Sequence, residues 1–423
     1  MTLATLLVSA LLLMGRLAGY VRELTIARTV GANASSDQII VLLTLPDLLF
    51  NMLIAGGIAG VLVPLLSGKS PEDCADLVKT FFMATFAIFL GAVLVLIIAA
   101  NGVAGALAPG LDNTQQQTLA NWIRLSSPAV IAVACAGVLN AYLNSRNQFY
   151  LSSVGGLVMN LSLIAALLLA YYLDSNALAW AVGAIVVGGM IRYAIPKFAA
   201  ARTLPQGKVN LHLMDNALLK RLMFCMVAVG VAQFTPVIVR SFASSTGAGA
   251  LTNFNYALKL VELPLTLIAS GLATVGLPAM AGHYKAKDFP EMRKLYFAQV
   301  RLGVAMGLAC LVMGHLLAEW GVRLLFGSEK ISETGLMEIT HYLKLLLWVA
   351  PVYAIYAPTI NLLNASDRQK QLLYATLLST TGAILICYIL AKTAPHFVPM
   401  GVLASYSISL AAGYWFSKDL IAK

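Results

Sequence analysis

The sequence IAGGIAGVLVP occupies residues 54–64, and a partial copy of it, IASGLATVGLP, occupies residues 268–278. A second echo pairs Leu143 and Asn144 with Leu363 and Asn364. Six long apolar runs lie on each side of residues 201–216. Because six is an even number, two such units would enter the membrane in the same direction and form two lobes around a central cleft. Chance similarity between segments rich in Gly, Ala and Leu is the alternative.

The composition indicates a membrane protein. The chain has 423 residues, of which 60% are hydrophobic and 11% are charged, whereas a soluble domain has roughly a quarter charged residues. At about 20 apolar residues per crossing, the chain has enough for about a dozen spans. We therefore predict an all-α polytopic membrane protein with about 12 transmembrane helices. They are expected near residues 1–27, 36–67, 76–100, 118–144, 149–173, 177–200, 217–243, 250–282, 293–326, 335–364, 370–392 and 396–417.

The lysines and arginines predict the orientation. If the N-terminus is cytoplasmic, most cations outside the spans, with Arg192 counted among them, fall in the inner loops and tails. Both termini are therefore expected on the cytoplasmic side. This bias accounts for most of the net charge of +10 without nucleic acid as a partner. Residues 201–216 form the expected cytoplasmic linker between an N-terminal lobe, 1–200, and a C-terminal lobe, 217–423.

The first predicted helix carries three charges, Arg16, Arg22 and Glu23. An ionisable side chain at bilayer depth costs roughly 2.5–3.5 kcal/mol on insertion scales, so each needs a partner, water or a function. Arg16 is the deepest of the three. Two interpretations remain open, a snorkelling or internally paired arginine and a cation that faces a water-filled cleft.

Charges also occur in the seventh and eighth predicted helices. Lys259 and Glu262 are three residues apart and share a helix face, directly before Pro264. They form either an internal ion pair or a lysine held ready for a competing anion. Arg240, near the end of the seventh helix, is interpreted as an interfacial arginine with a possible gating role.

Two aspartates flank the start of the second predicted helix. Asp37 follows Ser35 and Ser36, and its expected role is to cap the helix N-terminus. Asp47 follows Pro46 in an apolar run, so we expect it to pair with an arginine of the first helix or to help bind a coupling cation.

Several functions lack their sequence signatures. The chain has no P-loop, no nucleotide fingerprint and no metal-binding motif, and its five cysteines lack metal-ligand spacing. An enzyme is therefore not expected, and no cofactor is predicted. A secondary transporter or flippase with an anionic cargo remains, driven by sodium, protons or the membrane potential. A non-transporting scaffold for glycan synthesis is the alternative from another class.

Five motifs carry a resemblance to a known family. GRLAGYVRE (15–23), ARTVGA (27–32), LPDLL (45–49), LNAYLNSRNQF (139–149) and YALKLVELP (256–264) resemble the MurJ/MviN lipid II flippase family of the multidrug/oligosaccharidyl-lipid/polysaccharide exporter superfamily. The chain looks like a divergent, short member. The resemblance implies a protein of the bacterial cytoplasmic membrane that moves undecaprenyl-diphosphate-linked lipid II from the cytoplasmic to the periplasmic leaflet by alternating access. It also implies membrane lipids and the cell-envelope glycan synthesis machinery as partners.

The resemblance also implies site residues. Arg16, Arg22, Lys259 and Glu262 match charged cavity positions that contact substrate, and Lys259 stands where the family usually has arginine. Asp37 matches a family acid, and Asp47, Glu23 and Arg240 are further candidates for coupling or gating.

The chain departs from the family pattern at two places. Phe50 and Asn51 replace an arginine pair, and the family's two further C-terminal helices are not expected before Lys423. A flippase for an exopolysaccharide or O-antigen unit and a cation-coupled multidrug exporter are therefore the alternatives.

Overall fold

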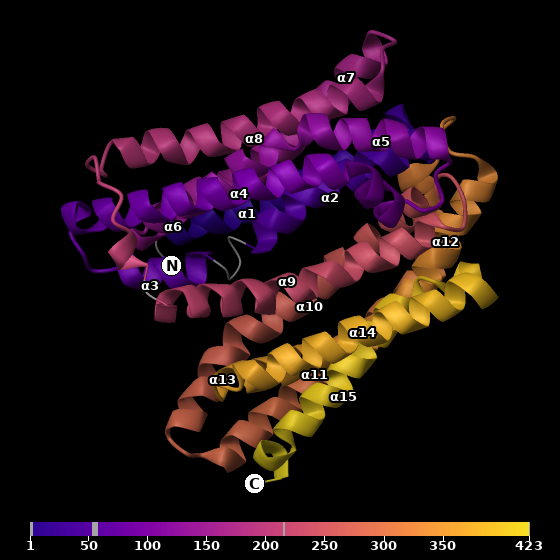
Figure 1. Cartoon of the computed structure of the whole chain (residues 1–423). Coiled ribbons are helices and arrows are strands. Elements are labelled where there is room, and N and C mark those ends of the chain that lie inside the picture. The colour runs from indigo at the N-terminus through magenta and orange to yellow at the C-terminus, as the bar shows by residue number, and fades with distance from the viewer. Residues whose placement is uncertain (1–2, 53–57, 215, 423) are drawn as a thin grey trace. The chain divides into compact units, whose positions relative to one another are not determined.

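The computed structural model describes residues 3–52, 58–214 and 216–422 (Figure 1). Within these ranges every regular element is a helix and no strand occurs, which confirms the all-α prediction. The chain divides into two compact units, Met1–Gln233 and Phe234–Lys423, and the division falls inside one helix, α9 (Asn216–Ser244). The first of the two repeat segments, residues 54–64, lies partly outside the described residues.

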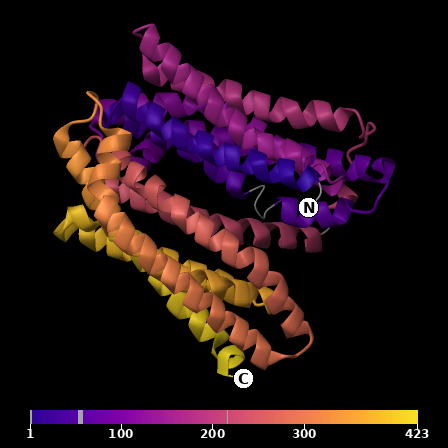
Figure 2. The same cartoon turned by 180° about the vertical axis from the view of Figure 1, so that it is seen from behind.

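Among its described residues, the first unit contains eight α-helices, a short 3-10 helix and the beginning of α9. The helix α1 packs along α7, which is distant from it in sequence, and α7 also packs along the next helix, α8 (Figures 1 and 2). The bounds are α1 (Leu3–Thr29), α2 (Ala34–Met52), α3 (Ile58–Leu66), α4 (Pro71–Leu107), α5 (Asn113–Ser126), α6 (Pro128–Ser145), α7 (Phe149–Tyr172), α8 (Ala177–Ala201) and η2 (Leu211–Leu213).

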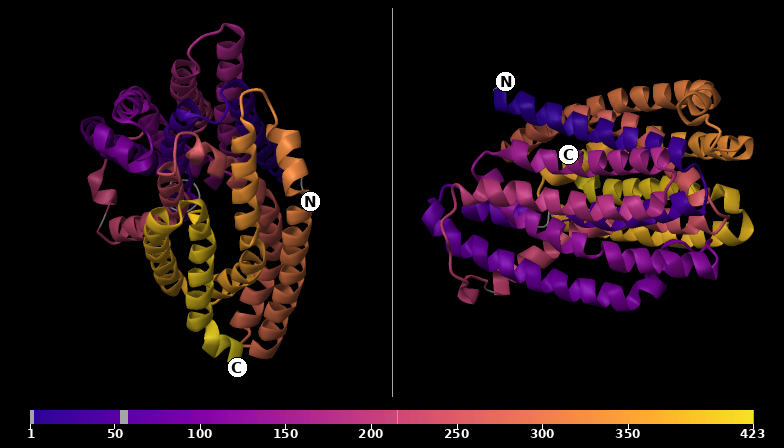
Figure 3. Two further views of the ribbon diagram at one scale, coloured as in Figure 1. Left: turned by 90° about the vertical axis from the view of Figure 1, so that its right-hand side faces the viewer. Right: turned by 90° about the horizontal axis from the view of Figure 1, so that it is seen from above.

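The second unit contains the rest of α9 and six further α-helices. The helices α14 and α15 run side by side, and α13 packs against α10, α11 and α15 (Figure 3). The bounds are α10 (Ala250–Lys285), α11 (Phe289–Phe326), α12 (Glu333–Leu347), α13 (Val349–Ala365), α14 (Gln369–Thr393), η3 (Pro395–Phe397) and α15 (Met400–Ala422).

Eight helical segments among the described residues are long and apolar enough to cross a membrane, one of them the α12–α13 segment Glu333–Ala365. Their outer faces carry apolar side chains, for example Ile98 at 82% exposure, Leu316 at 73% and Val275 at 69%. Such faces suit contact with lipid hydrocarbon, where every backbone polar group must be bonded inside the helix. The remaining predicted crossings coincide with α1, α2–α3, α9 and α15, so twelve crossings in two lobes are consistent with the structure.

Two predicted helices are each divided in the structure. The run predicted as 118–144 forms α5 and α6, with the junction at Ser127 and Pro128. Pro128 has no N–H to bond the carbonyl of Arg124, and the Ser127 hydroxyl donates to that carbonyl instead, at 2.8 Å. The run predicted as 335–364 likewise forms α12 and α13, which meet at Trp348.

The order of elements repeats between the units. In both, a short helix capped at its N-terminus by Asp112 or Ser332 precedes a buried helix, α6 or α13. Each buried helix is followed by a non-glycine residue in the left-handed region, Asn147 at φ 60° and Asp367 at φ 56°. These two residues are 220 positions apart, which is the spacing of the second sequence echo. The repeat predicted from sequence therefore has a structural counterpart.

Candidate substrate-binding charges

An ion pair in α1 forms the centre of the charge cluster in the first unit. The Arg22 guanidinium donates to the Glu23 carboxylate at 2.6 Å, and the two residues are 7% and 1% exposed. Arg22 also donates to the Oδ1 atom of Asn160 on α7, at 2.9 Å. A buried guanidinium with these partners is neutralised and fixed in position by the protein.

Two glycines allow α7 to approach this part of α1. The Asn160 amide donates to the carbonyl of Gly15 at 3.1 Å. A Cβ atom at Gly19 would lie 3.4 Å from the Asn160 amide nitrogen. Small residues at such positions let transmembrane helices come close enough for interhelical hydrogen bonds. Asn160 was not predicted from sequence because an uncharged amide hardly changes the hydropathy of an apolar helix.

Asp47 of α2 joins the same cluster. Its Oδ2 atom lies 3.5 Å from the Arg22 guanidinium, which confirms the predicted pairing with an arginine of the first helix. The Asp47 side chain is 43% exposed, so it is the accessible acid of the cluster. Asp47 also interacts electrostatically with Arg192 of α8.

Arg192 is not a loop residue, which corrects the sequence interpretation. It lies inside α8 and is 2% exposed. Its side chain packs over Gly155 of α7, where a Cβ atom would lie 3.1 Å from the Arg192 Nε atom. The sequence contained the signal, since residue 192 falls within the span predicted at 177–200. Arg22, Asp47 and Arg192 therefore bring charges from α1, α2 and α8 into one region of the first unit.

Arg16 and Asp37 differ in accessibility. Arg16, one and a half turns before Arg22 on α1, is exposed, and Asp37 in the first turn of α2 is completely buried. The predicted capping role of Asp37 is wrong. Asn33 caps α2, because its side-chain oxygen accepts from the backbone N–H groups of Ser35 at 2.8 Å and Ser36 at 3.3 Å.

The second unit contains the predicted pair in α10. The Lys259 ammonium lies 2.6 Å from the Glu262 carboxylate, and their side chains are 28% and 40% exposed. The pairing is confirmed, and both groups stay accessible. An anion would therefore have to compete with one carboxylate for the Lys259 ammonium.

Three tyrosines of the second unit form a cluster, and one of them interacts with Glu262. Tyr353 and Tyr356 of α13 and Tyr406 of α15 form a cluster with ring centroids 5.1–5.7 Å apart. Tyr406 interacts electrostatically with the Glu262 carboxylate. Tyr406 therefore connects the cluster to the ion pair, and the sequence reasoning did not single the cluster out. Arg240 lies partly buried on α9.

Among the described residues, no three or more His, Cys, Asp or Glu side chains gather closely enough to hold a metal ion. A family model described as lipid II flippase MurJ matches residues 26–419. The chain belongs to the lipid II flippase MurJ family. This family consists of membrane transporters and not of enzymes, and its members are multi-pass proteins of the bacterial inner membrane.

Curated relatives agree with this assignment. The lipid II flippase MurJ of Burkholderia cenocepacia is 28% identical over 308 residues, which cover 69% of this chain and 59% of the relative. The probable lipid II flippase MurJ of Buchnera aphidicola is 23% identical over 358 residues, which cover 80% of this chain and 68% of the relative. The chain thus matches about three fifths of the length of the Burkholderia protein.

Solved structures share the fold. A lipid II flippase MurJ in an inward closed conformation has a TM-score of 0.86 at 17% identity, covering 98% of this chain and 87% of that chain. An inward-facing multidrug resistance MATE family transporter of the MOP superfamily has a TM-score of 0.80 at 11% identity, covering 99% and 98%. The fold is therefore that of the MurJ and MATE transporters.

Proposed function

We propose that this protein flips lipid II from the cytoplasmic to the periplasmic leaflet by alternating access. The observation that carries the proposal is the match of the MurJ family model to residues 26–419. Its relatives from Burkholderia and Buchnera are named lipid II flippase MurJ and probable lipid II flippase MurJ. Both termini are proposed to be cytoplasmic, in line with the distribution of lysine and arginine over the loops.

The charges support an anionic cargo. Arg16 in the first unit is exposed and Lys259 in the second is partly exposed, so each unit offers a cation that a diphosphate can reach. Arg22 is already bonded to Glu23, Asp47 and Asn160, and its proposed role is to set the local field and the position of α1. The three clustered tyrosines, one of which interacts with Glu262, are suited to contact sugar rings and hydroxyl groups of a glycan.

The proposal includes an energy source. Lipid II carries a negatively charged diphosphate, and its outward movement is favoured by an inside-negative potential by about 2.3 kcal/mol per charge per 100 mV. We propose the membrane potential as the driving force. A coupling cation bound by Asp47 or Glu262 is the competing source.

Complementation tests the function in cells. The chain is expressed in a bacterium whose own lipid II flippase is depleted, and the lipid II that becomes accessible at the periplasmic face is measured. Restored growth with restored accessibility supports lipid II as cargo. Normal membrane insertion with neither effect refutes this cargo, and a parallel O-antigen or exopolysaccharide export assay identifies another lipid-linked glycan.

A further inference from the structure

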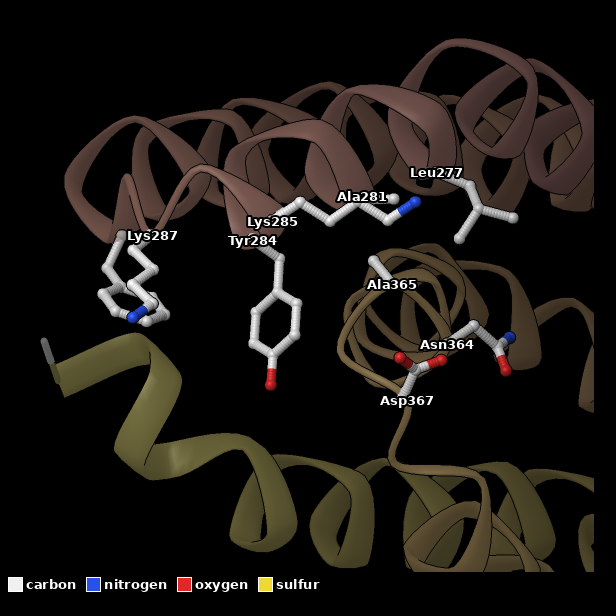
Figure 4. Close-up of a pocket in the computed structure, with 9 residues that line it drawn as sticks. Leu277, Ala281, Tyr284, Lys285, Lys287, Asn364, Ala365 and Asp367 are labelled. Atoms are coloured by element: carbon white, nitrogen blue, oxygen red, sulfur yellow. The ribbon is translucent and has the colours of Figure 1, made fainter.

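A pocket of about 610 Å³ lies at one end of the second unit. It is bounded by the last turns of α10 and α13 and by the start of α11 (Figure 4). Lys285, Lys287, Tyr284, Asn364 and Asp367 supply its polar groups. The view shows the Tyr284 ring between the two lysines, with the Lys285 ammonium toward Leu277 and the Lys287 ammonium on the opposite side, and the Asp367 carboxylate close to the end of α13.

The rest of the pocket wall is apolar. It consists of Leu277 and Ala281 from α10, Phe289 from α11 and Ala365 from α13. The pocket therefore combines two ammonium groups, one carboxylate, an amide and a phenol with a hydrocarbon surface. Such a combination suits an amphiphile better than a fully hydrated small ion.

The sequence repeat places an arginine at the corresponding end of the first unit. There Arg146, just after α6, donates to the carbonyl of Lys69 at 2.6 Å and lies over the Tyr142 ring at 5.4 Å. The sequence repeat aligns Arg146 with Ser366, which is small, and the Ser366 hydroxyl bonds back to the carbonyl of Leu362 at 2.8 Å. The second unit thus has a small, internally bonded residue at the position where the first unit has an arginine.

This end of the second unit is rich in cations. The acids here are largely paired: Glu291 lies 3.3 Å from Lys294, Asp288 lies 3.4 Å from His283, and Asp419 bonds to Arg368. A surplus of lysine and arginine at one end of membrane helices marks the cytoplasmic side and attracts anionic headgroups. The cations near this end are Lys285, Lys287, Arg293, Lys294, Arg368, Lys370 and Lys418.

We propose that this pocket binds the phosphodiester headgroup of a phospholipid from the cytoplasmic leaflet. The Lys285 and Lys287 ammonium groups contact the phosphate, and the Asp367 carboxylate accepts a hydrogen bond from the hydroxyl or primary ammonium of the head alcohol. The apolar wall contacts the start of the acyl chains. A soluble phosphate ester shares the same charged group but has no part for this wall.

Lipid retention on the purified full chain tests the site. The protein is incubated with equal amounts of phosphatidylglycerol, phosphatidylethanolamine and phosphatidylcholine, and bound lipid is counted by native mass spectrometry. We expect retention of the first two over phosphatidylcholine, whose quaternary ammonium cannot donate to Asp367. The double variant Lys285→Ala/Lys287→Ala is expected to retain these lipids about tenfold less.

A matched control separates the pocket from general charge. Lys294→Ala/Lys370→Ala removes the same charge from the same end outside the pocket, and its lipid retention should equal that of the wild type. Equal losses in both double variants, or no loss in either, overturn the proposal.

A second variant keeps the charge and fills the space. Ala281→Phe should lower retention while leaving the lysines in place, and unchanged retention contradicts the site. Glycerol phosphate serves as the soluble probe. If it displaces bound phospholipid at a concentration equal to that of the lipid, the assignment to a lipid is overturned. Because no lipid II enters this experiment, its outcome is independent of the proposed flipping.

Discussion

Two arginines on one helix, Arg16 and Arg22, have different surroundings. Arg22 is buried against Glu23, and Arg16 is exposed. Removing one partner of a buried ion pair costs about 3–5 kcal/mol, because the remaining charge loses its counter-ion in a medium of low dielectric constant. Arg22 is therefore expected to be important for stability, and Arg16 for contact with the cargo.

Thermal unfolding of the purified protein distinguishes these roles. Arg22→Met is expected to lower the unfolding free energy by about 3 kcal/mol or more, and adding Glu23→Gln should recover much of the loss because the buried charge is then gone. Arg16→Met should leave the unfolding temperature nearly unchanged. Strictly additive effects of Arg22→Met and Glu23→Gln would contradict a coupled buried pair.

Side chains also show what a single sequence reveals about a site. The Lys259–Glu262 pair and a pairing of Asp47 with an arginine of the first helix were among the predictions because charges in apolar runs are conspicuous, and the structure identifies that arginine as Arg22. Asn160 was missed because an uncharged amide in an apolar run is not conspicuous. The cap at Asn33 was assigned to Asp37 because both residue types favour helix starts. The substrate-binding and coupling roles of the site residues remain predictions.

At the level of helices, the contact between α11 and α13 depends on two glycines four residues apart. A Cβ atom at Gly303 would lie 2.6 Å from the carbonyl oxygen of Ala354, and one at Gly307 would lie 2.8 Å from that of Ala350. Both neighbours are backbone atoms, so a side chain can fit only if the helices separate. The spacing is that of the small-residue motif by which transmembrane helices approach closely.

Alanine substitutions test this contact. Gly303→Ala and Gly307→Ala are each expected to destabilise the protein by about 1–3 kcal/mol through overpacking. Gly321→Ala is the matched control on the same helix, since its Cβ would meet no atom within 4 Å, and it should be neutral or slightly stabilising. Equal unfolding temperatures for all three variants would show that α11 and α13 are not closely packed.

The hydropathy of the sequence predicts where the helices lie, but it does not predict where a helix is interrupted. All twelve predicted runs coincide with helices within several residues at each end, apart from 53–57, which lie outside the described part of the chain. The break at Trp348 was missed because it lies inside a continuous apolar stretch. The break at Ser127 was missed although Ser126, Ser127 and Pro128 interrupt the run there. A proline alone is a poor guide, since α10 continues through Pro264 and Pro278.

For the protein as a whole, the proposed driving force has a direct consequence. If an anionic headgroup moves outward along the membrane potential, collapsing the potential should slow transport, and abolishing the sodium gradient alone should not. Vesicles with valinomycin and potassium on both sides provide the first condition, and sodium-free buffers provide the second. Transport that persists without a potential but stops without sodium would identify cation coupling instead.

Reconstitution of the purified chain into proteoliposomes with fluorescent lipid II tests the central claim most directly. The account predicts that the protein moves lipid II between leaflets, that Arg16→Ala and Lys259→Ala abolish the movement in stably folded protein, and that Lys259→Arg preserves it. Wild-type protein that inserts correctly and leaves lipid II in its original leaflet, or full activity in both alanine variants, would contradict the account.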